Sequence, residues 1–445
     1  MHMGSKRWSA TQILTVGFAG MILIGAILLS LPISDRDGSG IPFLSALFTA
    51  TSASCVTGLI VYDTWTQFSF IGQLVILLLM QIGGLGFMVV AILFSLAVGR
   101  KIGLRERSLL METVGTTQLG GVIRLVRRTL IGTAVIEGGG ALLLALRFVP
   151  RFGFLRGFWF AAFHSVAAFC NAGFDLMGIS APYSSLMGYY DDPLVILTIA
   201  ALILIGGIGF VVWNDLVECR FCIRKLNLHT RTVLIGTAAL TLGSMLFFLF
   251  LEANGVMAGM RPGQRILAAL FQSVTPRTAG FNSLDIAALS DGSKFLTMLL
   301  MFVGAAPGGT GGGVKITTLA VIAAAVAASV RSREDISLGR FRLENETLFR
   351  AFCGTATYLA LTVCGIIVLC AQGSAFTDST FECLSAIGTV GLTTGITRAL
   401  PALSHLMLIV LMYAGRVGSL TVFLAVSEAG PRHKLKDPIG KIIVG

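Results

Sequence analysis

Residues 43–59 read FLSALFTATSASCVTGL, an apolar stretch that ends in a short turn carrying a glycine. The same plan occurs three more times along the chain. The other copies read FWFAAFHSVAAFCNAGF (158–174), ILAALFQSVTPRTAGF (266–281) and STFECLSAIGTVGL (379–392). Their last glycines, the turn glycines, are Gly58, Gly173, Gly280 and Gly391, at intervals of 115, 107 and 111 residues. A repeat of roughly 110 residues therefore organises the chain.

The composition indicates an all-α membrane protein. Hydrophobic residues make up 55% of the chain and charged residues 12%, whereas soluble domains carry about 25% charged residues. Long segments without charge are typical of transmembrane helices, which need about 20 apolar residues. We predict eight spans. They cover residues 11–32, 70–99, 129–149, 193–214, 232–252, 295–330, 351–376 and 401–427.

Each repeat is predicted to contain a span, a short re-entrant helix, a turn and a second span. The stretch before each turn glycine is too short to cross a bilayer, which needs about 20 residues. Irregular backbone at membrane depth persists only where protein or a watery cavity surrounds it. Four such turns can line one axis, with carbonyl oxygens that replace the hydration shell of an ion.

A second glycine follows each turn. It either lets two helices pack closely or contributes to the pore. These glycines are Gly83, Gly206, Gly304 and Gly415.

The formal net charge is +11, and the basic residues cluster between pairs of spans. The positive-inside rule places such clusters, and with them both termini, in the cytoplasm. We expect no nucleic-acid partner, because the aromatic residues that stack on bases do not alternate with these charges. The basic blocks are 100–128, 215–231, 331–350 and the tail 428–445.

The predicted span 295–330 is interrupted by GAAPGGTGGGVKITT, residues 304–318. This is not a phosphate-binding loop, because Val314 separates the last glycine from Lys315. We interpret the stretch as a broken membrane helix. A charge is costly in lipid, so we expect Lys315 to face the bundle interior or the pore. Arg416 lies at the equivalent depth in the fourth repeat, and both cations either face the pore or pair with neighbouring groups.

Several other polar residues carry individual predictions. We expect Glu137 to pair with a neighbour rather than to bind Na⁺, Arg277 to be held by an acid, and His164 to serve packing. Cys55 and Cys170 are predicted to be buried, inert thiols. Asp63, Asp175 and Asp285 follow three of the turn glycines, where they would either concentrate cations at the mouth or be solvated.

The motifs give no sign of an enzyme or a metal site. Cys219 and Cys222 form a C-x-x-C without the second pair that a zinc site needs. We find no H-E-x-x-H, paired carboxylates or nucleophile constellation.

Six strings carry a family resemblance that covers residues 11–445. They are TATSASCVTGL, FCNAGFDL, FQSVTPRTAGFNSLD, SAIGTVGLTTG, GGTGGGVKITT and AGRVGSLT. On these the chain resembles the Ktr/Trk/HKT superfamily of potassium transporters, and most closely the membrane subunit of bacterial Ktr systems. The related Trk subunits usually carry two further N-terminal helices, for which we expect no room here.

The resemblance implies a pseudo-fourfold pore with one filter glycine in each repeat. The implied K⁺-binding filter residues are Val56, Thr57, Gly58, Asn171, Ala172, Gly173, Thr278, Ala279, Gly280, Thr389, Val390 and Gly391. The resemblance also implies an intramembrane gate below the filter. The implied gate residues are Gly308, Gly309, Thr310, Gly311, Gly312, Gly313, Lys315 and Arg416.

The same resemblance implies K⁺ as the permeating ion, Na⁺ as an activator and no organic cofactor. It implies a homodimer in the bacterial inner membrane, in contact with lipid and with a cytosolic ring of Rossmann-type nucleotide-binding subunits. The expected boundaries are an N-terminus 1–10, pore repeats 11–107, 108–225, 226–340 and 341–427, and a tail 428–445. Besides a Trk-type transporter, the alternative is a coupled transporter of another solute, although such proteins usually have two repeats, often inverted.

Overall fold

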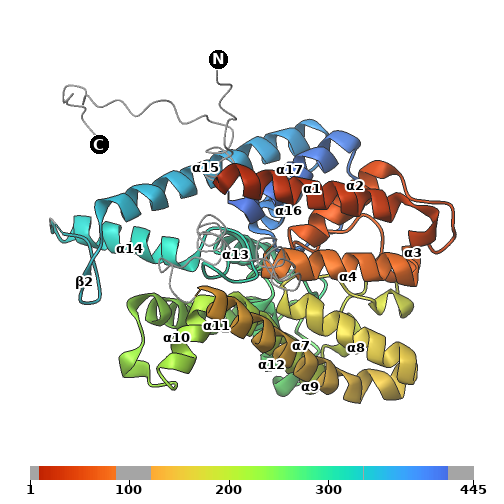
Figure 1. The fold of residues 1–445 in the computed structure, drawn as a ribbon, viewed down its shortest axis with the longest axis horizontal. Helices are drawn as coiled ribbons and strands as arrows, with labels where there is room; N and C mark the ends of the chain where they lie inside the picture. The colour runs from red at the N-terminus through yellow and green to blue at the C-terminus, as the bar shows by residue number, and fades with distance from the viewer. Residues whose placement is uncertain (1–9, 87–121, 334, 419–445) are drawn as a thin grey trace.

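The computed structural model describes residues 10–86, 122–333 and 335–418, and helices make up most of it (Figure 1). Within these ranges three helices are long and apolar enough to cross a membrane alone. They are α7 (Val122–Phe152), α11 (Leu228–Leu251) and α15 (Asn345–Ala371). The rest of the helical bundle consists of shorter helices. They are α1 (Ala10–Ser30), α2 (Phe43–Ser54), α3 (Thr64–Gln67), α4 (Phe70–Leu85), α8 (Phe154–Phe169), α9 (Pro193–Gly207), α10 (Phe210–Glu218), α12 (Pro262–Val274), α13 (Asp291–Phe302), α14 (Ile316–Val330), α16 (Phe376–Gly388) and α17 (Ala402–Val417).

Several predictions fall partly outside the described residues. These are the ends of spans 70–99 and 401–427, the N-terminus 1–10, the basic block 100–128 and the tail 428–445. The basic block 331–350 contains a small antiparallel hairpin of β1 (Ser337–Leu338) and β2 (Phe341–Arg342), which the sequence did not predict.

The predicted span 193–214 is not one straight helix, because α9 and α10 meet at an angle of 90°. At the corner Gly209 has a φ of +92°, a conformation that glycine tolerates far better than other residues. The backbone N–H of Phe210 donates to the carbonyl oxygen of Gly308 at 3.0 Å. A partner about a hundred residues away thus replaces a helical hydrogen bond that the bend removes.

The interruption predicted in span 295–330 is confirmed, because residues 303–315 form an irregular loop between α13 and α14. We call this segment the intramembrane loop. Its two ends are pinned together, since Val303 pairs with Val314 and the N–H of Gly304 donates to the Val314 carbonyl at 2.8 Å. The loop therefore begins and ends at one point of the bundle.

The helices close into a ring through two kinds of contact. Each of the helices α1, α7, α11 and α15 packs against the short helix that follows it, respectively α2, α8, α12 and α16. Four further contacts link one such group to the next: α4 with α8, α9 with α12, α13 with α16, and α17 with α2. The last contact returns to the beginning of the chain, so the arrangement closes on itself.

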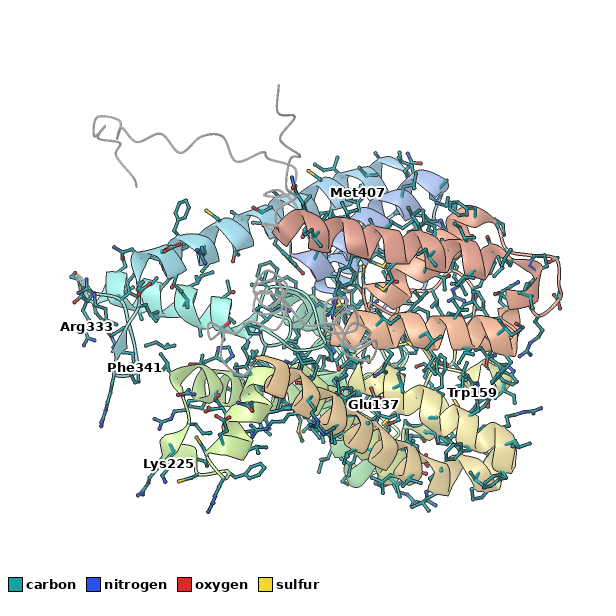
Figure 2. The ribbon with its side chains drawn as sticks, viewed as in Figure 1. Glu137, Trp159, Lys225, Arg333, Phe341 and Met407 are labelled. Atoms are coloured by element: carbon teal, nitrogen blue, oxygen red, sulfur yellow. The ribbon has the colours of Figure 1, made fainter. Side chains whose placement is uncertain are left out.

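The outer surface of the ring is apolar. Val135 on α7, Phe250 on α11 and Ile367 on α15 expose 67%, 80% and 62% of their surfaces. Such a surface suits lipid rather than water. Lys225, Arg333 and Phe341 lie on the same side of the molecule in Figure 2. This distribution is that of a helical membrane protein.

Three of the second glycines allow a very close helix contact. A methyl group at Gly83, Gly206 or Gly415 would overlap the carbonyl oxygen of Ser54, Phe169 or Ile387, respectively. Each of these carbonyls lies in the last turn of α2, α8 or α16. The close-packing interpretation therefore holds for these three, whereas Gly304 packs against Gly312 of the intramembrane loop.

Gly415→Ala is expected to lower thermal stability in detergent, because overpacking of this kind costs about 1–3 kcal/mol. Gly243→Ala on α11 is the matched control, since nothing lies within 4 Å of the added methyl group. Melting of the purified protein, followed by intrinsic fluorescence, checks the difference. Equal melting temperatures for the two variants would contradict the packing argument.

Candidate ion pathway

The four turns share one backbone conformation. The residue two positions before each turn glycine has a positive φ, although none of these residues is glycine. The values are 58° for Val56, 58° for Asn171, 69° for Thr278 and 51° for Thr389. The turn glycines have positive φ values as well, between 69° and 94°. A positive φ is uncommon in residues other than glycine, and most of all in β-branched residues. Its occurrence at the same place in all four turns indicates that the four turns need the same backbone shape.

The turn glycines themselves form a closed ring. A methyl group at Gly58 would come within 2.6 Å of the Ala172 carbonyl oxygen, and one at Gly173 within 2.8 Å of that of Ala279. Still closer approaches link Gly280 to the Val390 carbonyl and Gly391 to the Thr57 carbonyl. Each glycine thus faces the carbonyl of the next turn, and the fourth faces the first.

Four helices end at this ring. α2, α8, α12 and α16 each stop within a few residues of a turn glycine, so their carboxyl ends, which carry partial negative charge, converge there. The carbonyl oxygens of Thr57, Ala172, Ala279 and Val390 lie between consecutive glycines. The arrangement can therefore stabilise a cation on the axis, and all of the predicted filter residues take part in these turns.

Serine side chains hold two of the turns, which the sequence interpretation missed. The Ser52 hydroxyl accepts a hydrogen bond from the N–H of Gly58 at 3.0 Å, and Ser385 does the same for Gly391 at 3.1 Å. Both serines stand six positions before their glycine, and this shared spacing was the available signal. Between the second and third turns, the Asn171 amide and the Thr278 hydroxyl lie 3.1 Å apart.

A cavity of about 290 Å³ opens on one side of the ring. It is lined by all four turn glycines and by Asp175, Asp285 and Arg398, and we call it the mouth cavity. Burial, together with the neighbouring Asp63 carboxylate, raises the pKa of Asp175 to about 7. Two of the three predicted acids therefore line the cavity.

Asp63 does not line the mouth cavity, and the alternative that it is a solvated acid is wrong. Its side chain is 3% exposed and accepts hydrogen bonds from the N–H groups of Trp65, Thr66 and Tyr183. It caps α3 and ties that helix to the segment after the second turn. Capping of this kind is a common use of aspartate.

The intramembrane loop lies on the other side of the ring and contacts the second, third and fourth repeats. Gly311 and Gly312 press against the hydroxyl groups of Thr278 and Thr389, and the N–H of Gly312 donates to Thr389 Oγ1 at 3.0 Å. The buried Thr310 hydroxyl donates to the Phe169 carbonyl at 3.1 Å. Its own carbonyl accepts from Arg416. The loop therefore covers the inner end of the ring.

Lys315 and Arg416 bind backbone carbonyls of this region. Lys315 Nζ donates to the carbonyl oxygens of Gly311 at 2.6 Å and Gly312 at 3.4 Å. The Arg416 guanidinium reaches Thr310 on the loop and also Gly83 and Gly84 at the end of α4, the latter at 3.2 Å. Of the two open interpretations, pairing is therefore present for both cations, and it ties the loop to the surrounding helices.

Predictions for three further residues are confirmed. Glu137 is paired as expected, since Gln81 Nε2 donates to it at 3.2 Å. Cys55 and Cys170 are buried free thiols, also as expected.

Within residues 10–86, 122–333 and 335–418 no acid pairs with Arg277, which contradicts the prediction. The hydroxyl groups of Thr237 and Thr241 on α11 accept its hydrogen bonds. His164 packs against Phe148 and Phe160, and it also accepts a hydrogen bond from the N–H of Leu176 at 3.3 Å.

Comparison with known proteins agrees with this geometry. The TrkH family model, described as a cation transport protein, matches residues 9–437. The chain belongs to the TrkH family. It is 40% identical to the Ktr system potassium uptake protein B of Bacillus subtilis, over 99% of this chain and 97% of the relative. It is 39% identical to the potassium/sodium uptake protein NtpJ of Enterococcus hirae, over 99% and 98%.

The fold is also that of a solved family structure. The crystal structure of the potassium transporter TrkH from Vibrio parahaemolyticus matches with a TM-score of 0.74, covering 96% of this chain and 87% of that one. The sequence identity is 19%, so this likeness concerns the fold alone. Together with the 40% identity above, it confirms the resemblance to Ktr-type membrane subunits within this superfamily.

Arg416→Ala is expected to loosen the intramembrane loop, because the loss removes the guanidinium contacts to Thr310 and the end of α4. Hydrogen–deuterium exchange of the amides in residues 303–315 should become faster. Arg350→Ala is the control, since that arginine forms only an exposed ion pair with Glu346. Exchange that stays equal in the two variants would show that Arg416 does not hold the loop.

Proposed function

We propose that this protein takes up K⁺ through a pore on the axis of the four turns. The observation that carries the proposal is the closed ring, in which each turn glycine faces the carbonyl of the next turn. Backbone carbonyls replace the hydration shell of a potassium ion in selective pores. The names of the relatives, which are potassium uptake proteins, support the same ion.

In this proposal the chain consists of four like repeats that supply eight spans around the pore. The ring of contacts between successive groups of helices supports this architecture. The repeats have the expected boundaries 11–107, 108–225, 226–340 and 341–427. The Ala172, Ala279, Thr57 and Val390 carbonyls form one ring rather than several, so the filter should select K⁺ less strictly than a channel with a longer filter.

The intramembrane loop acts as the gate. It lies against Thr278 and Thr389 directly below the ring, and its glycines leave no side chain in the way of movement. Lys315 and Arg416 hold the loop in the closed position and place positive charge on the ion path. Opening requires the Thr310 carbonyl and the Arg416 guanidinium to separate, which gives a regulator a specific contact to act on.

The rest of the proposal concerns the assembly. Two copies form a homodimer in the bacterial inner membrane, each with its own pore, and both termini face the cytoplasm. A cytosolic ring of Rossmann-type nucleotide-binding subunits docks on the basic loops, in keeping with relatives named as parts of a Ktr system. Na⁺ activates uptake, and the name of the potassium/sodium uptake protein NtpJ supports this ion. No enzymatic step or organic cofactor is involved in this chain.

Expression in a bacterial strain that lacks its own potassium uptake tests the function. We expect growth at low external K⁺, and stronger growth when Na⁺ and a regulatory ring are present. A membrane fraction confirms that the protein is made. Absence of rescue under all conditions, with the protein present in the membrane, would favour another cation or a coupled transporter of an organic solute.

Gly280→Ser is expected to admit more Na⁺, because a side chain there displaces the Val390 carbonyl from the ring. The K⁺/Na⁺ uptake ratio in cells should fall several-fold. Gly188→Ser is the control, since its added atoms meet nothing within 4 Å. An unchanged ratio in Gly280→Ser would argue against a filter role for the third turn.

Deletion of residues 308–313 is expected to raise K⁺ flux in the absence of the regulator. The deletion removes the carbonyls of Thr310, Gly311 and Gly312, which Lys315 and Arg416 bind. Rb⁺ flux into proteoliposomes measures the effect without other cell proteins. A deleted protein that still needs the regulator would show that this loop is not the gate.

A further inference from the structure

One carboxyl group lies buried in the helix that leads to the fourth turn. Glu382 on α16 has no exposed surface. The Thr393 hydroxyl donates to Oε1, and the Thr397 hydroxyl donates to Oε2 at 2.9 Å. Both partners belong to the segment after the turn glycine Gly391. The two oxygens of one side chain therefore bind two separate points of that segment.

That segment forms a wall of the mouth cavity. Thr393, Thr394, Gly395 and Thr397 all line the cavity, and we call residues 393–397 the outer wall. The wall is fixed internally, since the Thr393 Oγ1 accepts from the N–H of Gly395 at 2.8 Å and lies 3.0 Å from Thr397 Oγ1. His405 on α17 binds the Thr397 carbonyl at 2.8 Å. Within this network Glu382 is the side chain that comes from α16, the helix that leads to the fourth turn.

The second turn uses a different side chain for the same purpose. His164 and Glu382 both stand nine positions before their turn glycine. His164 Nδ1 lies 2.7 Å from the Phe160 carbonyl, so Nδ1 donates and Nε2 accepts from the N–H of Leu176. Leu176 lies three residues after Gly173, and Thr393 lies two residues after Gly391. In both turns a buried polar side chain holds the chain just beyond the ring.

The first and third turns have no such side chain nine positions before their glycine. Thr49 donates instead to the Ser45 carbonyl within its own helix at 3.0 Å, and Phe271 has no polar group. Contacts run from the first turn to the second, third and fourth and back to the first, so the second and fourth turns face each other across the axis. His164 and Glu382 thus serve two opposite turns. The third turn is held from another position, since the Thr275 hydroxyl donates to the Phe281 carbonyl at 2.7 Å.

A carboxylate suits the fourth position better than any other side chain of its length. Both of its oxygens accept hydrogen bonds, whereas an amide offers one acceptor and two donors. Glutamine in place of Glu382 can accept from only one of the two threonine hydroxyls. One of the two hydrogen bonds that the outer wall donates to residue 382 is then lost, while His405 still binds the Thr397 carbonyl.

We propose that Glu382 is a positioning residue for K⁺ at the mouth: it fixes residues 393–397 and thereby sets the affinity with which K⁺ is captured above the fourth turn. The inference rests on the proposed function as a potassium pore. His164 holds the second turn in the same way from the opposite side. K⁺ capture, rather than folding or gating, is the property that these contacts control.

Kinetics of K⁺ uptake in the uptake-deficient strain test this role. Glu382→Gln and Thr397→Val should each raise the KM for K⁺ about fivefold or more, the effect of losing roughly one such hydrogen bond. The maximal rate per amount of membrane protein should change less than twofold. Both changes break the same contact, between Glu382 and Thr397. The KM of the double variant should therefore equal that of the single variants, and the two effects on KM should not multiply.

Two control variants keep the outcome clear. Thr397→Ser keeps the hydroxyl and should retain the wild-type KM, and Asp378→Asn, in the first turn of the same helix, should do so as well. Unchanged KM values in Glu382→Gln and Thr397→Val would overturn the inference. So would losses of membrane protein or maximal rate with no change in KM. Failure of the wild-type protein to take up K⁺ would instead overturn the proposed function itself.

Discussion

The structure depends on a ring of four glycines, one in each turn. Each glycine lies so close to a carbonyl oxygen of the next turn that no side chain fits at its position. Gly58, Gly173, Gly280 and Gly391 each face the carbonyl of the next turn, and any added methyl group would come closer than 3.0 Å to an oxygen. The four short helices end where this ring requires them to, and their partial negative charges converge on it. An irregular backbone can persist at this depth because protein surrounds it except where it lines the mouth cavity.

The intramembrane loop satisfies the same constraint from below. An unpaired backbone group in a dry interior costs several kcal/mol, and the loop has many such groups. Its carbonyls are bound by Lys315 and Arg416, and its amides bind Thr389 and the carbonyl ends of α9. Two cations that would be expensive in lipid thus stabilise a loop that has no helix of its own. The contacts that close the loop are few and polar, which suits a segment that has to move.

The sequence predicted the turns well because each is a local pattern: an apolar stretch, a small turn and a glycine. It predicted the break in span 295–330 for the same reason, since the glycines themselves cause it. The bend between α9 and α10 was missed, because the sequence does not show that the distant Gly308 accepts the hydrogen bond of Phe210 that the helix no longer provides for. Asp63 and Arg277 were misjudged for a related reason, since their partners are backbone amides and threonine hydroxyls that the fold brings to them. The cyclic order of the turns likewise needed the structure, because spacing along the chain does not say which turns touch.

The central claim is that the four carbonyls of the ring hold a potassium ion. A cryo-electron microscopy structure of the protein in lipid nanodiscs, determined once in K⁺ and once in Na⁺, tests it most directly. The account predicts a density peak on the axis in K⁺, enclosed by the carbonyl oxygens of Thr57, Ala172, Ala279 and Val390, that weakens or disappears in Na⁺. Density of equal strength in both salts, or an ion held elsewhere with these carbonyls turned away from the axis, would contradict it.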